Sequence, residues 1–514
     1  FLLCNTCIAA SAQTLRGVIE GTVIDRDTKQ PVSKAKITVL KIKRTALTDS
    51  LGYFHIDGLE SGVYSIGVSA LEYRNVVKTD IRVGPAQSAK LALELPQMEI
   101  RAGEVVISAA SDKFFETNED TRVSANILSQ EEVRRAPGAV EDVSRMVQGL
   151  PGVVTASDAR NDIIARGGSP SENFIMIDGI EIPNINHFAT QGASGGPIGM
   201  INVDFLEDVN FSAGGFGVKY GDRLSSVMDI KYREGDKHGL HGKLDIGLAG
   251  GGIILEGPIQ EDRSSFLISA RRSYLDFIVG GTGLTAVPNY WNFNAKATFV
   301  LSKQHKLTFI GIGGIDNITF DDFGAEDSPF LSTRIYKGSQ ALIGLSDNWL
   351  VNSNCFIRTS VSTDRYKVDF QRDTIGRTQN YNRALESETL LRSDMSYRLS
   401  PEDLLEIGIT ARAISDNNEL YQEKRVDKFG VERPELRLNQ TTNAGKLGFY
   451  GQYTRSFFGV FDITAGVRID YFSYLNSPTA FAPRIAASYQ ATDKLQFNLS
   501  AGIYNQAPPL FWLV

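Results

Sequence analysis

The chain has 514 residues, and its hydrophobic and charged fractions of 42% and 22% exclude a disordered protein. Its net charge of −7 excludes a nucleic-acid binder, because no basic excess is available to neutralise phosphates. The 48 glycines, 28 phenylalanines and 18 tyrosines indicate a protein built mainly from β-strands and turns.

The first twelve residues have the pattern of a secretory signal peptide that begins inside its apolar part. The apolar run ends at the small-x-small site Ala10-Ser11-Ala12 and is too short to span a membrane. A buried helix is the alternative. Two of the three cysteines fall in this segment, so Cys355 is left alone and no internal disulfide is possible. We predict that residues 1–12 are a partial signal peptide.

Residues 17–97 read as short alternating strands separated by turns, at the spacing of a small β-sandwich. The stretches GTVIDRDTKQPVSKAKITV, TDSLGYFHIDGL and GVYSIGVSALEY resemble the carboxypeptidase regulatory-like domain. That resemblance implies a fold and no catalysis. Asp25 and Asp27 would suit Ca²⁺, but a turn with two acids is far more often only a turn.

Residues 104–236 mix helical and strand patterns and predict an α/β domain. Ser129 and Glu132 have the spacing of a capping box, which starts one helix. A Pro-Gly pair then separates this helix from a second helical stretch over 141–150. A glycine-rich run and further strand patterns follow.

The stretch IIARGGSPSENFIMIDGIEIPN, residues 163–184, places Arg166 beside two glycines. Such a corner suits an anion cradle, a catalytic loop or a tight turn. An anion cradle requires a helix N-terminus, and no helix start follows the glycines. A catalytic loop requires a nucleophile with a partner residue, and none lies nearby. We therefore predict a tight corner, a buried strand over 174–177 and a turn at Asp178-Gly179.

From residue 238 onward, apolar and polar side chains alternate along strand after strand. In FDITAGVRIDYFS, Ile463, Val467 and Ile469 oppose Arg468 and Asp470. This alternation fits lipid outside and a wet lumen inside, and short links alternate with long polar ones as in transmembrane barrels. A water-soluble sheet is the alternative, but its links would not sort into two lengths. No later apolar segment reaches the roughly 18 residues of a transmembrane helix.

The second and third zones together resemble the TonB-dependent outer-membrane receptors and transporters. The resemblance is carried by NDIIARGGSPSENFIMIDGIEIPNINHF, FLEDVNFSAGGFGVKYGDRLSSVMDIKYREGD, SFLISARRSYLD and APRIAASY. A regulatory-like sandwich before the plug resembles the Bacteroidota-type arrangement. It implies a mainly β fold with a β-sandwich at 17–97, an α/β plug at 104–236 and a transmembrane antiparallel β-barrel over 238–514. The family closes its barrel with about 22 strands. About 13 are visible here, so the sequence is expected to be truncated at both ends.

The resemblance implies a TonB-energised receptor that imports a scarce, bulky ligand through the cell outer membrane by plug displacement. A metal chelate, cobalamin, an oligosaccharide and a peptide are all open as ligands. A receptor that acts in signalling or adhesion with little transport is the alternative. The hexapeptide EVVISA matches the TonB box, which adds as a strand to its periplasmic partner. It comprises Glu104, Val105, Val106, Ile107, Ser108 and Ala109. An ordinary first strand of the plug is the competing interpretation of EVVISA.

Two further groups of residues are candidates for functional contacts. A loop rich in donors, with an imidazole and an aromatic ring, would bind substrate at the plug apex through Asn184, Asn186, His187 and Phe188. Charged side chains of the plug and early barrel would pair to hold the plug: Arg166, Arg223, Glu234, Arg271 and Arg272. A solvated loop and plain surface charges are the alternatives.

An enzyme is not expected. None of the five histidines lies in a His-x-x-Glu or His-Glu-x-x-His pattern, and no Gly-x-Ser-x-Gly or phosphate-loop motif occurs. We predict no catalytic residue, metal ligand or cofactor. The expected partners are a TonB-type energy-transducing protein, outer-membrane lipids and an unknown small or polymeric ligand, with a surface lipoprotein as a further candidate. The sandwich and the TonB box would lie in the periplasm.

Overall fold

The computed structural model describes most of the chain and divides it into two compact units. The described residues are 17–25, 30–40, 42–59, 62–71, 73, 75–83, 88–95, 125–139, 141–157, 160–247, 250–274, 288–321, 332–352, 354–374, 377–400, 402–426, 430–492 and 495–513. The predicted signal segment and the predicted TonB box over 104–109 lie outside them. Within the described ranges, no helix is both long and apolar enough to cross a membrane.

The first unit contains two small sheets, in agreement with the predicted sandwich. One sheet has the order β4 (Tyr53–Leu59), β1 (Gly17–Asp25), β7 (Ser88–Leu95). The other has the order β3 (Arg44–Leu47), β2 (Lys36–Val39), β5 (Gly62–Ser69), β6 (Val76–Val83). Buried residues alternate along β1, and apolar residues of both sheets form a single core. Asp25 accepts a hydrogen bond from Tyr73 at 2.8 Å, and Asp27 lies outside the described residues.

The plug of the second unit is built on a five-stranded mixed sheet. Its order is β12 (Ile180–Glu181), β11 (Asn173–Ile177), β16 (Ser226–Tyr232), β15 (Leu206–Ser212), β8 (Ala125–Ser129). β11 is buried at all five positions and runs parallel to β16, which explains its continuous apolar run. Short pairs and 3-10 turns complete the plug: β9 (Val153–Val154) with β10 (Ile164–Ala165), β13 (Asn186–His187) with β14 (Ile198–Gly199), η2 (Pro170–Glu172) and η3 (Val203–Phe205).

Two short helices begin where the sequence indicates. α1 (Gln130–Arg135) carries both hydrogen bonds of the predicted capping box between Ser129 and Glu132. α2 (Val143–Gln148) is capped by Asp142, whose carboxylate accepts a hydrogen bond from the backbone N–H of Ser144 at 2.8 Å.

The stretch over 163–184 is part of the plug core. Arg166 and Gly167 both have positive φ angles, of 50° and 82°, and form the predicted tight corner. Asp178 and Gly179, with φ of 50° and 84°, join β11 to β12 as a two-residue hairpin. Asp-Gly is favoured at such turns because both central residues require positive φ.

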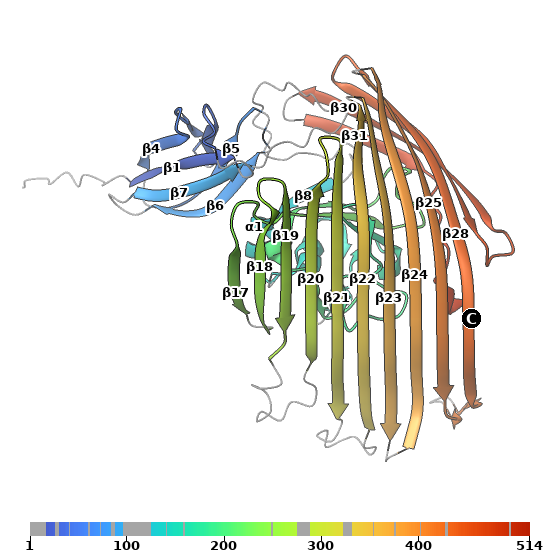
Figure 1. The fold of residues 1–514 in the computed structure, drawn as a ribbon. Coiled ribbons are helices and arrows are strands. Elements are labelled where there is room, and N and C mark those ends of the chain that lie inside the picture. The colour runs from blue at the N-terminus through green and yellow to red at the C-terminus, as the bar shows by residue number, and fades with distance from the viewer. Residues whose placement is uncertain are drawn as a thin grey trace, which may run out of the picture. The chain divides into compact units, whose positions relative to one another are not determined.

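The rest of the second unit is a 13-stranded antiparallel sheet in which each strand pairs with the next along the chain. It comprises β17 (His241–Gly247), β18 (Gly250–Gln260), β19 (Ser264–Arg272), β20 (Asn289–Val300), β21 (His305–Asp321), β22 (Ser332–Asn352), β23 (Cys355–Thr374), β24 (Arg377–Ser400), β25 (Asp403–Gln422), β28 (Leu436–Phe457), β29 (Phe461–Phe472), β30 (Thr479–Thr492) and β31 (Leu495–Gly502). A small hairpin, β26 (Arg425–Val426) and β27 (Glu432–Arg433), lies between β25 and β28, and η4 (Leu510–Trp512) follows β31. The number of strands agrees with the prediction. The sheet is strongly curved, and the plug lies against its concave face (Figure 1).

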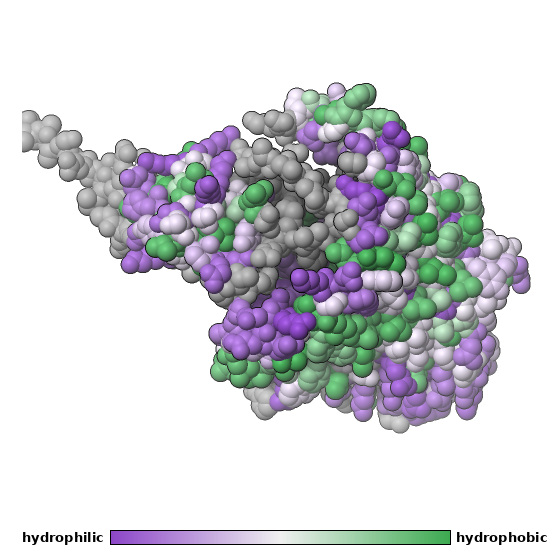
Figure 2. Space-filling view, turned by 45° about the horizontal axis from the view of Figure 1, so that its top comes forward, coloured by the Kyte–Doolittle hydropathy of each residue, from purple (hydrophilic) through white to green (hydrophobic). Residues whose placement is uncertain are grey.

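The two faces of the curved sheet differ in polarity as predicted. On β20, Asn294 and Lys296 are buried on the inner face, whereas Phe293 on the outer face is 42% exposed. On β22, Gln340 is buried inside and Ile343 is 59% exposed outside. Figure 2 shows hydrophobic residues spread over the outer surface of the strands. An apolar outer face with a polar inner face is the pattern of a transmembrane β-barrel.

Candidate functional site between the plug and the barrel wall

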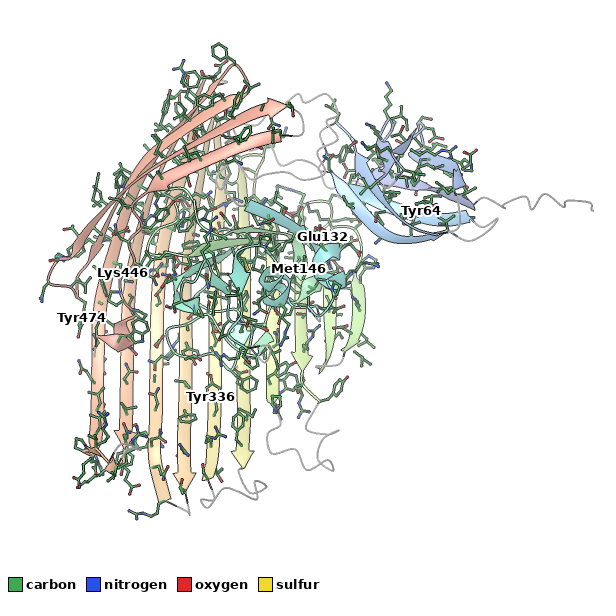
Figure 3. All side chains as sticks on the ribbon, turned by 180° about the vertical axis from the view of Figure 1, so that it is seen from behind. Tyr64, Glu132, Met146, Tyr336, Lys446 and Tyr474 are labelled. Carbon is green, nitrogen blue, oxygen red and sulfur yellow. The ribbon has the colours of Figure 1, made fainter. Side chains whose placement is uncertain are left out.

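The plug contacts the inner face of the barrel in two different ways. Along β18–β22, apolar wall residues join the plug's own hydrophobic core: Ile254, Leu267, Ile310, Ile312 and Leu342. Along β24–β30, the wall presents mainly charged side chains to the plug, and two further charged pairs lie on the first side, at β20 and β21. Figure 3 shows the plug from the side opposite to Figure 1, within the curve of the long strands.

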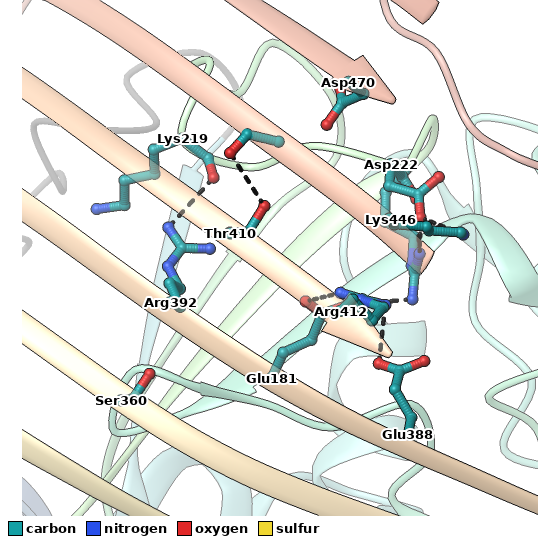
Figure 4. A network of polar contacts seen from close by, with 12 residues as sticks. Glu181, Lys219, Asp222, Ser360, Glu388, Arg392, Thr410, Arg412, Lys446 and Asp470 are labelled. Atoms are coloured by element: carbon teal, nitrogen blue, oxygen red, sulfur yellow. Dashed lines mark hydrogen bonds and ion pairs between the residues drawn. The ribbon is translucent and has the colours of Figure 1, made fainter. Parts of the chain in front are cut away.

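The centre of the charged contact is Glu181, at the end of β12 in the plug. Its Oε2 atom lies 2.5 Å from Nη2 of Arg412 on β25, and its Oε1 atom lies 3.3 Å from Arg223 of the plug. Arg412 also pairs with Glu388 on β24 at 2.9 Å (Figure 4). One wall arginine therefore joins a plug carboxylate to a wall carboxylate.

A second ion pair lies beside the first. Asp222 of the plug is 2.7 Å from Lys446 on β28 (Figure 4), and it accepts a backbone hydrogen bond from Ala507. Burial would raise the pKa of Asp222, but Lys446, followed by Arg223 and Arg412, lowers it to about 2.

The same balance acts on Glu181. Burial would raise the pKa of Glu181, but Arg412 and Arg223 outweigh it and hold this pKa below its ordinary value. Both plug carboxylates are therefore ionised at neutral pH, and the plug is joined to the wall by fully charged pairs.

Arginines of the wall also bind the backbone of the plug loop 216–220. Arg484 on β30 donates hydrogen bonds to three carbonyl groups of this loop, those of Phe216, Gly217 and Tyr220, at 3.2, 2.6 and 2.8 Å. Arg392 on β24 donates to the carbonyl of Lys219 at 3.2 Å (Figure 4). These wall residues add donors to the loop carbonyl groups, of which that of Gly217 also accepts from the backbone N–H of Tyr220 within the loop.

At the other side of the plug, two more carboxylates meet lysines of the wall. Asp178, in the turn after β11, is 2.9 Å from Lys296 on β20. Glu234 is 2.5 Å from Lys306 on β21 and 2.8 Å from Lys237. Burial would raise the pKa of Glu234, but Lys306 and then Lys237 lower it to about 2.

The residues predicted to pair plug with barrel fall into two groups. Arg223 and Glu234 belong to the charged contacts just described. Arg271 instead pairs with Asp245 of β17 at 2.5 Å, and Arg272 lies over the ring of Trp291 of β20, because antiparallel pairing sets these side chains beside one another within the wall. The side chain of Arg166 runs beside Gly214 of the plug.

The residues predicted to bind substrate are buried against the wall, with exposed fractions of 5%, 2%, 0% and 9% for Asn184, Asn186, His187 and Phe188. Nδ1 of His187 lies 2.6 Å from Asp316 on β21, whose second oxygen accepts from the backbone N–H of Phe188 at 2.8 Å. Asn184 meets a glutamine of β22, and Asn186 an asparagine of the plug. The segment is buried because β13 pairs with β14 beside the wall. Its role in substrate binding stays a prediction.

Several wall residues that contact the plug were not singled out from the sequence: Arg392, Arg412, Lys446, Arg484, Tyr336 and Tyr366. The hydroxyl groups of the two tyrosines donate to the carbonyl of Ala189 at 3.0 and 2.9 Å. A charged residue at an inward position of an alternating strand was the available signal. This signal identifies a residue that faces the lumen, but it does not identify the plug residue that it contacts.

Three family models match the chain in succession. The carboxypeptidase regulatory-like domain matches residues 18–96, the TonB-dependent receptor plug domain matches 117–226, and the TonB-dependent receptor-like β-barrel matches 271–514. A curated relative, the TonB-dependent transporter Oar of Myxococcus xanthus, is 24% identical over 313 residues. That alignment covers 58% of this chain and 28% of the relative, so the chain spans little more than a quarter of its length.

Solved structures of outer-membrane proteins share the fold. The outer membrane transporter YddB from Escherichia coli has a TM-score of 0.55 at 13% identity, over 77% of this chain and 64% of its own. A mutant of the ferric enterobactin receptor PfeA from Pseudomonas aeruginosa has a TM-score of 0.57 at 13% identity, over 76% and 63%. The siderophore receptor PirA from Acinetobacter baumannii has a TM-score of 0.55 at 13% identity, over 75% and 61%. With its plug, its barrel strands and its regulatory-like sandwich, the chain belongs to the TonB-dependent receptors of the outer membrane.

Proposed function

We propose that this chain is a TonB-energised receptor that imports a scarce, bulky ligand into the periplasm when its plug is displaced from the barrel wall. The observation that carries the proposal is the charged contact between the plug and β24–β30. Two plug carboxylates, the buried Glu181 and the partly buried Asp222, are held there by Arg412 and Lys446. Charged pairs of this kind regain hydration when they separate into a wet lumen, so they hold a closed plug at little net cost of release.

The two kinds of contact suggest where the plug moves first. Separation of the apolar contact along β18–β22 would expose hydrocarbon to water, at about 25 cal/mol for each Å². The contact along β24–β30 is mainly polar and carries less of this cost. We therefore infer that the plug leaves the wall on the β24–β30 side while its apolar side stays in place, which would open a passage beside Arg412 and Lys446.

The pull would come through the hexapeptide at 104–109. The outer membrane has no ATP, so energy must arrive from a periplasmic partner. An extended segment that adds as a strand to a TonB-type protein transmits force through backbone hydrogen bonds. The regulatory-like sandwich precedes this segment in the chain and would share its periplasmic side.

The test is to break the hexapeptide in cells that carry the full chain. Val106→Pro removes a backbone donor in the middle of the segment, and Ser108→Ala is the matched control that keeps the backbone intact. Binding and uptake are measured with a labelled panel that holds a ferric chelate, cobalamin, an oligosaccharide and a peptide. We expect the proline variant to bind its ligand as the natural chain does and to lose uptake, while the alanine variant keeps both.

Unchanged uptake in the proline variant would refute energised import. Saturable binding without uptake in the natural chain would instead support a receptor for signalling or adhesion.

A further inference from the structure

A cavity of about 160 Å³ lies between the plug segment 189–194 and the inner face of β23–β25. Four carboxylates from these three strands line it: Asp364, Glu386, Glu388 and Asp416. In the strand register, Asp364 is directly opposite Glu388, and Glu386 is directly opposite Asp416. Residues that face one another across neighbouring strands point to the same side of the sheet, so all four carboxylates face the plug.

The cations that line the same cavity already have anionic partners. Arg412 is shared between Glu181 and Glu388, Lys446 pairs with Asp222, and Arg223 pairs with Glu181. Among the described residues, these pairs leave three carboxylates of the cavity, Asp364, Glu386 and Asp416, without an ion pair.

The neighbours of these three carboxylates are neutral amides. Gln340 donates to Asp364 at 3.3 Å, and the side chains of Gln191 and Asn418 lie beside Glu386 and Asp416. An amide supplies a hydrogen bond without neutralising the charge.

Two carboxylate oxygens still lack a donor. In the part of the chain that the structure describes, Oε1 of Glu386 and Oδ1 of Asp416 are buried with no hydrogen-bond partner, and Asp416 is only 2% exposed.

Without a bound cation, this arrangement of carboxylates destabilises the folded protein. Like charges directly opposite on neighbouring strands destabilise a sheet, and a buried carboxylate without a partner loses its hydration uncompensated. A cation in the cavity would relieve both effects. Among the described residues, no group of three or more acidic, histidine or cysteine side chains has the geometry to hold a metal ion. The cavity is also much larger than the roughly 15 Å³ that one water requires.

We propose that this cavity is a subsite for an organic cation, an ammonium or guanidinium group that the ligand carries on a slender chain. Asp416 and Glu386 would receive the charged group between them, and Asp364 would add to the negative potential. The inference rests on the proposed function in one respect, because it makes the occupant part of the imported ligand. It narrows that ligand to molecules that bear at least one basic group, such as basic peptides and amine-bearing chelates.

The probe for this subsite is spermidine, with fully acetylated spermidine as its uncharged counterpart. Binding is measured by titration calorimetry on the purified full chain in detergent at low salt. The test variants, Asp416→Asn and Glu386→Gln, each remove one charge and keep the side-chain shape. The control is Glu432→Gln, which removes an exposed acid of the small hairpin β26–β27 that pairs with Lys424.

We expect saturable binding of spermidine, none of the acetylated form, and a loss of affinity of about tenfold or more in each test variant. The control variant should bind as the natural chain does. Absence of saturable spermidine binding, equal binding of the acetylated form, or unchanged affinity in both test variants would each overturn the subsite.

Thermal unfolding of the same samples gives a second readout. Removal of one carboxylate relieves repulsion, so neither test variant should melt below the natural chain. Spermidine should raise the melting temperature of the natural chain and of the control variant, and raise that of the test variants less. A fall in melting temperature with undiminished spermidine binding would show that the carboxylates serve the fold. The binding experiment contains no TonB-type partner, so its failure would refute the subsite alone. Failure of the uptake experiment in cells would refute energised import instead.

Discussion

The charged contact between plug and wall predicts a large effect of one substitution, Arg412→Met. The side chain of Arg412 is 11% exposed and is the wall partner of both Glu181 and Glu388. Removal of one member of a buried ion pair typically costs about 3–5 kcal/mol, because it leaves an uncompensated charge. Glu181 has a side chain only 5% exposed and keeps Arg223, which is 3.3 Å away, so the lower end of that range applies. A loss of about 3 kcal/mol corresponds to an increase of roughly a hundredfold in the population of the open contact.

Hydrogen exchange of the plug amides in the purified receptor measures this population directly. We expect the amides of β11 and β12 to exchange roughly a hundredfold faster in Arg412→Met than in the natural chain. Amides of β1 in the separate sandwich are the internal reference. The control substitution is Arg437→Met, which removes an exposed pair with Glu435 and should have no effect on the plug.

The double substitution Arg412→Met with Glu181→Gln completes the test. If the cost arises from a stranded carboxylate, removal of the carboxylate restores much of the lost protection, and the two effects are not additive. Plug exchange within twofold of the natural chain in Arg412→Met, or fully additive effects in the double variant, would refute the reasoning.

Four further predictions concern separate features. Because the folded pKa of Asp222 is lowered to about 2, its contribution to plug protection should be complete above about pH 4 and be lost as the pH falls toward 2. Asp222→Asn should reduce this dependence in hydrogen exchange, with Glu181 and Glu234 supplying the rest, and an unchanged dependence in that variant would contradict it. Arg484→Met should speed tryptic cleavage at Lys219 about tenfold, since three loop carbonyls lose the donor that the wall supplies; an unchanged rate would show that Arg484 does not hold the loop in place. Ile343→Arg on the outer face should destabilise the barrel in bilayers by about 2–4 kcal/mol in denaturant titration, and no shift would argue against lipid contact there. Gly179→Ala should lower plug protection, because φ is 84° and the added Cβ would lie 2.7 Å from Arg358; protection equal to that of the natural chain would show that the turn can relax.

The barrel strands and the plug turns were predictable because their causes are local. A strand with lipid on one side and water on the other must alternate, so the dyad pattern of FDITAGVRIDYFS places Ile469 outside and Arg468 inside. The capping box at Ser129 and the Asp-Gly turn before β12 depend on a few adjacent residues. Such features need no knowledge of distant parts of the chain.

The contacts across the lumen were not predictable, because they depend on the register of many strands. Glu181 and Arg412 are 231 residues apart in the sequence, and which inward residue meets which plug residue follows from the accumulated stagger of the sheet. The apex segment shows a second limit. Its polar composition suggested exposure, yet His187 is fully buried because Asp316 and Asn292, far along the chain, satisfy its ring nitrogens.

The wall arginines that bind loop 216–220 have a consequence for how this receptor tolerates change. Arg484 and Arg392 contact main-chain oxygen atoms, which every amino acid possesses. A replacement at Lys219 therefore keeps the loop in place, whereas a replacement at Gly221 would force Arg468 to move, since its Cβ would lie 1.8 Å from Nε of Arg468. At Lys219 the barrel recognises the path of the backbone, whereas at Phe216 the same Arg484 also lies over the aromatic ring. The side chain at position 219 is thus free to diverge, whereas those of Phe216 and Tyr220 are fixed by the core in which they are buried.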